Sequence, residues 1–232
     1  MRTVLALIAA LLLAACASMP AIQALDTDQE TFRAGICRAH FPEGGWQLVH
    51  TINASIQGGR QATFTGVVIL SPEDDSIRCA VMTLEGFVLF EAEDRGRVIV
   101  KRAFGPFNDE NFARGVVDDI RFLFVEPKGD SVAGLFGDGS RGCRYRTARG
   151  RTVDLVEGPD GGWRMRQYDS RGYPMRTMTA DAPNDEGFSR RIVLQSDGRH
   201  GYRLTMTLVE AISIQGPPEL KNSTRKKIRS DF

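Results

Sequence analysis

The feature that most constrains the fold is a succession of short segments between Trp46 and Glu210 in which apolar and polar residues alternate. Alternation with a period of two, rich in Val, Ile, Thr and Phe, is typical of strands that bury one face. The turns between them, such as 58–59 and 94–96, are short. Connections of this length join antiparallel neighbours. The predicted strands are 47–56, 61–70, 76–84, 86–92, 97–103, 142–147, 152–157, 163–168, 173–180, 188–195 and 201–210.

Two segments follow a helical period instead. Thr27 and Glu30 fit a capping box, which predicts a helix that runs up to the break at 42–45. A second helix is predicted over 108–125, with Asn108 as its N-cap. The fold class is therefore mainly β (α+β), without βαβ units. A curling antiparallel sheet of about eleven strands, with helices on one side, leaves a concave apolar face between sheet and helices.

The N-terminus has the layout of a bacterial lipoprotein signal peptide. Arg2 precedes an apolar run over residues 4–13, and the small residues Ala14 and Ala15 lead directly to Cys16. This run is well below the ~20 residues that span a bilayer. We expect cleavage before Cys16, whose thiol would carry diacylglycerol and whose amino group would carry a further acyl chain. Anchoring by more than one chain is stable, and the lack of an Asp after Cys16 resembles the sorting pattern of outer-membrane lipoproteins.

Composition fits one globular domain. We expect residues 1–15 to be the signal peptide, 16–25 a lipidated tether, 26–214 the domain and 215–232 a mobile basic tail with weak attraction for phospholipid. The chain holds 30 Lys and Arg and 29 Asp and Glu, so removal of Arg2 with the signal leaves 29 of each. This balance argues against a nucleic-acid partner.

The remaining cysteines are Cys37, Cys79 and Cys143, an odd number in a compartment where disulfides persist. None of their spacings matches a zinc site or a dithiol redox motif. We expect Cys79 to be a small buried hydrophobic residue. Whether the others form one disulfide stays open.

No catalytic motif is present. The sequence contains no GxSxG, GxGxxG or P-loop pattern. His40, His50 and His200 lie far apart, without the spacing of a metal site on one helix, and we expect them at the surface or in turns. The sequence therefore predicts a non-enzymatic protein with no metal and no cofactor besides the lipid on Cys16.

A glycine-rich segment over residues 134–137 places Leu135 and Phe136 in a predicted loop. Two interpretations remain open. The two side chains contact a membrane or close over a cavity, or they pack back into the core. We keep both residues as candidate membrane contacts.

The order of helix, hairpins, inserted helix and remaining strands resembles the LolA/LolB superfamily of periplasmic carriers and outer-membrane acceptors of lipoproteins. Several motifs resemble an uncharacterised outer-membrane lipoprotein family that is often encoded near aryl polyene or fatty-acid-like biosynthesis genes. They are FPEGGW (41–46), residues 66–74, MTLEGF (82–87), GW (162–163) and QYD (167–169).

The resemblance implies an unclosed β-barrel with helices as a lid, whose concave face holds acyl chains without covalent chemistry. The candidate lining residues are Phe64, Val68, Val81, Met82, Val88 and Phe90. An error of one residue in register would exchange the two faces of a strand. The superfamily's acceptor has a protruding loop with an exposed Leu, whereas the early turns at 71–75 and 93–96 are polar here.

These observations predict a periplasm-facing lipoprotein, anchored to the outer membrane through Cys16, that binds or transfers a hydrophobic acylated ligand. A lipoprotein, a glycolipid or a polyene lipid would fit, with a LolA-like periplasmic carrier as a partner. The alternative is a structural lipoprotein of an envelope complex, with the same fold, a filled core and no ligand.

Overall fold

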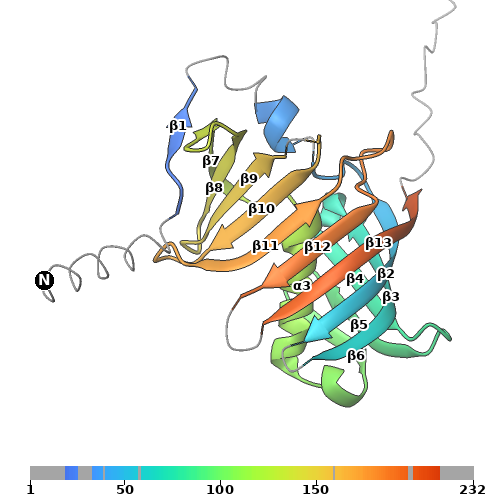
Figure 1. The fold of residues 1–232 in the computed structure, drawn as a ribbon. Helices are drawn as coiled ribbons and strands as arrows, with labels where there is room; N and C mark the ends of the chain where they lie inside the picture. Colours follow the sequence, from blue (N-terminus) through green and yellow to red (C-terminus); the bar gives the residue numbers. More distant parts are fainter. Residues whose placement is uncertain are drawn as a thin grey trace, which may run out of the picture.

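A computed structural model describes residues 19–25, 33–38, 40–56, 59–158, 160–197 and 201–214. It shows one curled antiparallel sheet of 13 strands, with helix α3 (Glu110–Phe124) on its concave side (Figure 1). The strands are β1 (Ile22–Ala24), β2 (Trp46–Ile56), β3 (Arg60–Ser71), β4 (Ser76–Met82), β5 (Val88–Asp94), β6 (Val98–Ala103), β7 (Gly129–Phe136), β8 (Arg141–Thr147), β9 (Thr152–Glu157), β10 (Trp163–Tyr168), β11 (Pro174–Ala180), β12 (Arg191–Ser196) and β13 (Tyr202–Ser213). Short helical turns are η1 (Arg33–Arg38), η2 (Pro72–Asp74) and η3 (Gly105–Phe107).

The sheet is an open half-barrel. Its strand order is β1-β7-β8-β9-β10-β11-β12-β13-β2-β3-β4-β5-β6, so β1 and β6 form the two edges. The last strand returns to the first long hairpin, and β13 pairs with β2 from Tyr202 opposite Ile56 to Ser213 opposite Trp46. This pairing confirms the predicted class, a mainly antiparallel β fold that curls without closing.

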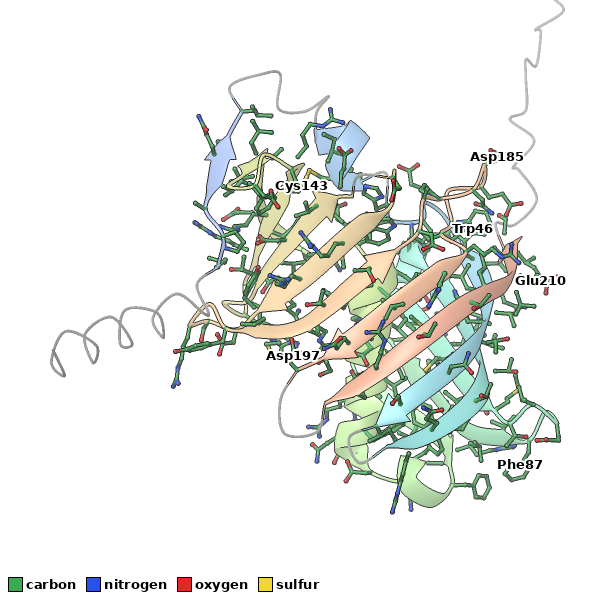
Figure 2. All side chains as sticks on the ribbon, in the orientation of Figure 1. Trp46, Phe87, Cys143, Asp185, Asp197 and Glu210 are labelled. Carbon is green, nitrogen blue, oxygen red and sulfur yellow. A yellow bond between two sulfur atoms is a disulfide. The ribbon has the colours of Figure 1, made fainter. Side chains whose placement is uncertain are left out.

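The core lies on the concave face, where every second residue of neighbouring strands points inward. The register of the pairs aligns one buried row across five strands. Its members, all 0% exposed, are Cys143, Leu155, Met165, Met178 and Leu194. Side chains on the outer face stand away from the sheet (Figure 2).

Helix α3 fills much of the concavity. Its N-cap is Asp109, whose carboxylate accepts a hydrogen bond from the backbone N–H of Phe112 at 3.0 Å. The prediction of Asn108 as N-cap is therefore wrong by one residue. The helix ends at Phe124 because Val125 is extended and Pro127 cannot continue a helix. Its buried side chains come from most of its circumference, as expected inside a curl: Ala113, Val117, Asp119, Ile120, Phe122, Leu123 and Phe124.

The predicted loop at 134–137 is wrong, because Gly134, Leu135 and Phe136 belong to β7. The same strand pairs with β1, which lies in the segment predicted to be a tether. Phe136 is buried, so the membrane contact assigned to it is contradicted, and Leu135 is partly buried between β1 and β8. Glycine is required at 134 because an added Cβ would lie 2.2 Å from the carbonyl oxygen of Gln23.

The first helix is described only as η1, a π-helical turn. Its predicted start at Thr27 lies outside the described residues, as do Cys16, His200 and the tail over 215–232. The predicted strand from residue 188 begins at Arg191 instead. Asn184 accepts hydrogen bonds from the backbone N–H groups of Glu186 and Phe188, which holds those residues in a turn.

The three cysteines of the described residues are one disulfide pair and one free thiol. Cys37 of η1 forms a disulfide with Cys143 of β8, which leaves Cys79 free and buried as predicted. The expectation that the histidines lie at the surface is wrong for His50, which is 4% exposed and whose ring lies 5.7 Å from that of Phe124.

Candidate functional site

Under the first turns of α3 a cluster of aromatic side chains lies on the concave face. Phe90 of β5 is 0% exposed, and its ring centroid lies 5.8 Å from that of Phe112, edge to face. Phe107 packs against Phe112 at 5.0 Å and against Phe64 at 5.8 Å. Edge-to-face contacts at these separations are favourable. Phe90 therefore belongs to the core and Phe107 packs against it, whereas Phe112 is 37% exposed.

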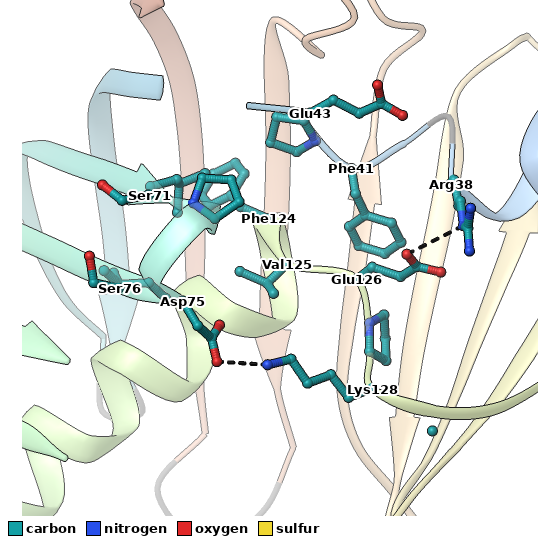
Figure 3. Close-up of a pocket in the computed structure, with 16 residues that line it drawn as sticks. Arg38, Phe41, Glu43, Ser71, Asp75, Ser76, Phe124, Val125, Glu126 and Lys128 are labelled. Atoms are coloured by element: carbon teal, nitrogen blue, oxygen red, sulfur yellow. Dashed lines mark hydrogen bonds and ion pairs between the residues drawn. The ribbon is translucent and has the colours of Figure 1, made fainter. Parts of the chain in front are cut away.

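A pocket opens at the opposite end of α3, with a volume of about 590 Å³. Three parts of the chain that are distant in the sequence form its walls: Arg38 with 41–43, the turn between β3 and β4, and 124–129 at the end of α3 (Figure 3). Its apolar lining residues are Phe41, Pro42, Leu70, Pro72, Ile77, Phe124, Val125 and Pro127. Charged side chains of Arg38, Glu43, Asp75, Glu126 and Lys128 join them.

Asp75 fixes one wall of the pocket. It ends η2 in the left-handed region, with φ at 51°, where a residue other than glycine is uncommon. Its carboxylate accepts hydrogen bonds from Lys128 at 2.7 Å and from Arg121 at 3.1 Å. The hydrogen bond from Lys128 lowers the pKa of Asp75, and the nearby Arg121 acts in the same direction. These two contacts thus connect the β3–β4 turn to α3 and to the segment after it.

The opposite wall is fixed by η1. The Cys37–Cys143 disulfide joins this turn to β8, and the hydroxyl of Tyr145 donates to the carbonyl oxygen of Cys37 at 3.2 Å. Next in the chain, Arg38 lies 3.7 Å from Glu126 across the pocket (Figure 3). Both walls are therefore held by covalent or ionic contacts, and Val125 projects into the space between them (Figure 3).

Two buried titratable groups of the sheet, Cys79 and His50, are held in their neutral forms. The Cys79 thiol, whose pKa burial raises to about 11, stays protonated and is a poor nucleophile. Burial lowers the pKa of His50 to about 4 and also lowers that of His40, whose ring stacks on Trp163 at 4.9 Å. Within the described ranges no group of three His, Cys, Asp or Glu side chains is placed to hold a metal ion.

The structure separates the predicted lining residues from the pocket. Pairing of Val81 with Gly66 and Phe90 puts Phe64, Val68, Val81 and Phe90 on the concave face. Met82 pairs with Thr65 and Val88 beside a bulge, which places Met82 on the other face. None of the six residues lines the pocket that the described residues form.

The prediction therefore missed the pocket residues, although it chose two of the right strands. Leu70 lies two residues beyond Val68 on the same face of β3, and Ile77 pairs with it from β4. Both residues flank the polar turn that Asp75 connects to α3. The other walls, at Phe41 and Val125, have no local sequence signal because tertiary contacts bring them there.

An open antiparallel half-barrel with a helix in its concavity and a pocket at one end of that helix defines a LolA-like fold. A LolA superfamily protein from Nitrosomonas europaea has this fold, with a TM-score of 0.57 and 12% identity over 82% of this chain and 94% of its own. A putative outer membrane lipoprotein-sorting protein domain from Vibrio parahaemolyticus matches with a TM-score of 0.52 and 11% identity, over 82% and 94% of the two chains.

At 12% and 11% identity these two likenesses describe the fold alone. No protein-family model and no curated protein matches the sequence. Among the helices of the described residues, none has the length and apolar character to cross a membrane.

Proposed function

We propose that this chain is a periplasm-facing outer-membrane lipoprotein, anchored through an acylated Cys16, that binds one hydrophobic acyl-bearing ligand without covalent chemistry. The observation that carries the proposal is the pocket of about 590 Å³ at the C-terminal end of α3. Ligand pockets in proteins usually measure ~300–1,000 Å³ and are mostly apolar with a few polar groups.

The arrangement of the pocket suits a ligand with an apolar chain and a polar head. Leu70, Ile77 and Phe124 supply apolar walls from three different elements. An acyl chain removed from water against such walls gains about 25 cal/mol per Å² of apolar surface. The charged pairs Asp75–Lys128 and Arg38–Glu126 contribute polar groups that a head group can contact. A lipoprotein, a glycolipid or a polyene lipid has this chemistry.

Two further observations support the proposal. The fold is shared with a protein described as a lipoprotein-sorting domain. Residues 13–16 have the pattern of a lipoprotein cleavage site, and acyl chains on Cys16 would keep the domain at the membrane from which such a ligand comes or to which it goes. A LolA-like periplasmic carrier is the partner that this role requires.

Native mass spectrometry of the full lipoprotein, extracted in mild detergent, tests ligand binding. We expect a population whose mass exceeds that of the acylated chain by that of one lipid. A protein that never retains lipid would contradict the proposal. Metabolic labelling with an alkyne palmitate tests the anchor separately, since Cys16→Ala should abolish the label that the wild-type chain acquires.

One observation favours a second candidate, a structural lipoprotein of an envelope complex with no ligand. The half of the concave face around Phe90, Phe107 and Phe112 is filled by the protein's own side chains. The two candidates differ at the pocket. Retention of lipid supports the first, whereas a labelled but lipid-free protein supports the second.

A further inference from the structure

The first described residues, 19–25, are held tightly against the sheet. Strand β1 pairs with β7, and just before it the carbonyl oxygen of Pro20 accepts a hydrogen bond from Arg144 Nη2 at 2.7 Å. The same guanidinium pairs with Asp154 at 2.6 Å and 2.7 Å and lies over the ring of Phe136. Arg144 and Asp154 are 5% and 2% exposed. A buried ion pair that is bonded at two points has a fixed geometry. The Arg144–Asp154 pair therefore holds Arg144 in the position from which it donates to Pro20 at the start of the domain.

Contacts with neighbouring turns also define the position of Met19, where this segment begins. A Cβ at Gly172, in the β10–β11 turn, would lie 3.9 Å from Cβ of Met19. A Cβ at Gly150, in the β8–β9 turn, would lie 3.7 Å from Cβ of Ser170. Met19 and the two turns at 147–151 and 169–173 are therefore neighbours.

The end of the sheet that these turns form presents cationic and aromatic side chains to solvent. Arg149 and Arg171 are exposed, and neither makes an ion pair with an acidic side chain of the described residues. Tyr173 is 53% exposed. Asp169 in the same turn accepts hydrogen bonds from the backbone N–H groups of Arg171 and Tyr173 at 2.9 Å each and so holds the turn in shape.

Covalent geometry limits how far this end can lie from Cys16. Three Cα–Cα steps separate Cys16 from Met19, which is a reach of at most about 10 Å. An acylated Cys16 sits at the membrane surface, so the turns beside Met19 are kept close to that surface. Guanidinium groups bind lipid phosphates, and tyrosine is favoured at the interface between head groups and acyl chains.

We propose that Arg149, Arg171 and Tyr173 form a membrane-docking end that rests on the phospholipid head groups beside the anchor. This inference depends on the proposed acylation of Cys16 but not on ligand binding in the pocket. Docking of this end gives the half-barrel one orientation on the membrane. The hydrogen bond from Arg144 to Pro20 would couple the position of the anchor to the orientation of the sheet.

The test uses the full lipoprotein carrying Tyr173→Trp, reconstituted into vesicles of phosphatidylethanolamine and phosphatidylglycerol with brominated acyl chains. Bromine quenches tryptophan that reaches the interface, and the wild-type protein gives the background from Trp46 and Trp163. Asp185→Trp is the matched control, in the exposed turn that follows β11 at the other end of the strand. We expect Trp at 173 to lose most of its emission and Trp at 185 to keep it.

Replacement of Arg149 and Arg171 by Glu in the Tyr173→Trp protein should reduce quenching to the level of the control, while the anchored protein still floats with the vesicles. If tryptophan at 173 and tryptophan at 185 are quenched equally in a protein that floats with the vesicles, the proposed membrane-docking end is wrong. The proposed acylation of Cys16 is then unaffected. A protein that neither floats nor incorporates palmitate would overturn both. The same circular dichroism spectrum and urea unfolding midpoint in each variant and the wild-type protein show that the fold is intact.

Discussion

Arg121 of α3 donates a hydrogen bond from Nε to Oδ2 of Asp94 on β5 at 2.8 Å, and this contact fastens the last turn of the helix inside the half-barrel. The Asp94 side chain is only 7% exposed, so Arg121 is the cation that compensates its buried charge. The same guanidinium reaches Asp75 at the pocket. Arg121 therefore joins the end of β5 to the β3–β4 turn that lines the pocket.

Replacing Arg121 with Met should lower the free energy of unfolding by about 2–4 kcal/mol, because Asp94 would stay buried without its partner. Urea denaturation followed by circular dichroism measures the change. Arg114→Met is the control, since among the described residues Arg114 pairs only with the exposed Glu110 one helical turn away. Its effect should be under ~0.5 kcal/mol. Equal losses in the two variants would show that the contact with Asp94 contributes nothing.

Asp119 should make the protein less stable as pH rises. Burial raises the pKa of this carboxyl from 3.8 to about 6, against the opposing effect of Arg176, which donates to it together with Tyr202. Between these pH values the folded state holds the proton and the unfolded state does not. The contribution of Asp119 is fully present below pH 4 and falls by about 3 kcal/mol as pH rises through 6. Asp119→Asn should lack this fall in urea titrations across the range, and Asp185→Asn, at an exposed turn, should retain it.

His50 should act in the opposite direction over nearly the same range. Burial lowers its pKa from 6.5 to about 4, so the unfolded state binds a proton that the folded state refuses. Its contribution to stability is present above pH 6.5 and is lost as pH falls through 4. His50→Gln should remove the slope that His50 contributes and leave only that of His40, whose pKa burial also lowers, against the opposite slope of Asp119. A variant with the wild-type profile would refute the assignment.

The Cys37–Cys143 disulfide should be a large contributor to stability, because it closes a loop of 106 residues. Its removal by Cys37→Ala and Cys143→Ala, or by reduction, should cost about 2–5 kcal/mol of unfolding free energy. A reducing agent should have no effect on the double variant. Since η1 forms one wall of the pocket, the reduced protein should also bind ligand more weakly. A wild-type protein that is equally stable with and without reductant would contradict this role.

The sequence predicts the regular strands well because their side-chain alternation is local. The strand from Thr152 to Glu157, for example, has the predicted limits. Strand β7 is not predicted because its glycines are typical of a loop. In the structure Gly134 allows the close approach of β1. Strand β1 has three residues and is defined only by its pairing with β7.

The pocket could be predicted only in part, for a related reason. Leu70 and Ile77 follow from the register of one hairpin, and the family resemblance selects their strands. Phe41 and Val125 reach the pocket through a disulfide, ion pairs and the end of a helix, all of which join residues far apart in the sequence. Local periodicity carries no information about such contacts.

Titration of the protein with a fluorescent fatty acid tests the central claim, that the pocket binds an acyl chain, most directly. The comparison is between Val125→Trp, which fills the pocket, and Val132→Trp, the same change at an exposed site on β7 outside it. The account predicts saturable binding to the wild-type protein and to Val132→Trp, and a loss of at least about tenfold in affinity, or ~1.4 kcal/mol, for Val125→Trp. Equal affinity of the two variants, or no uptake by the wild-type protein, would contradict it.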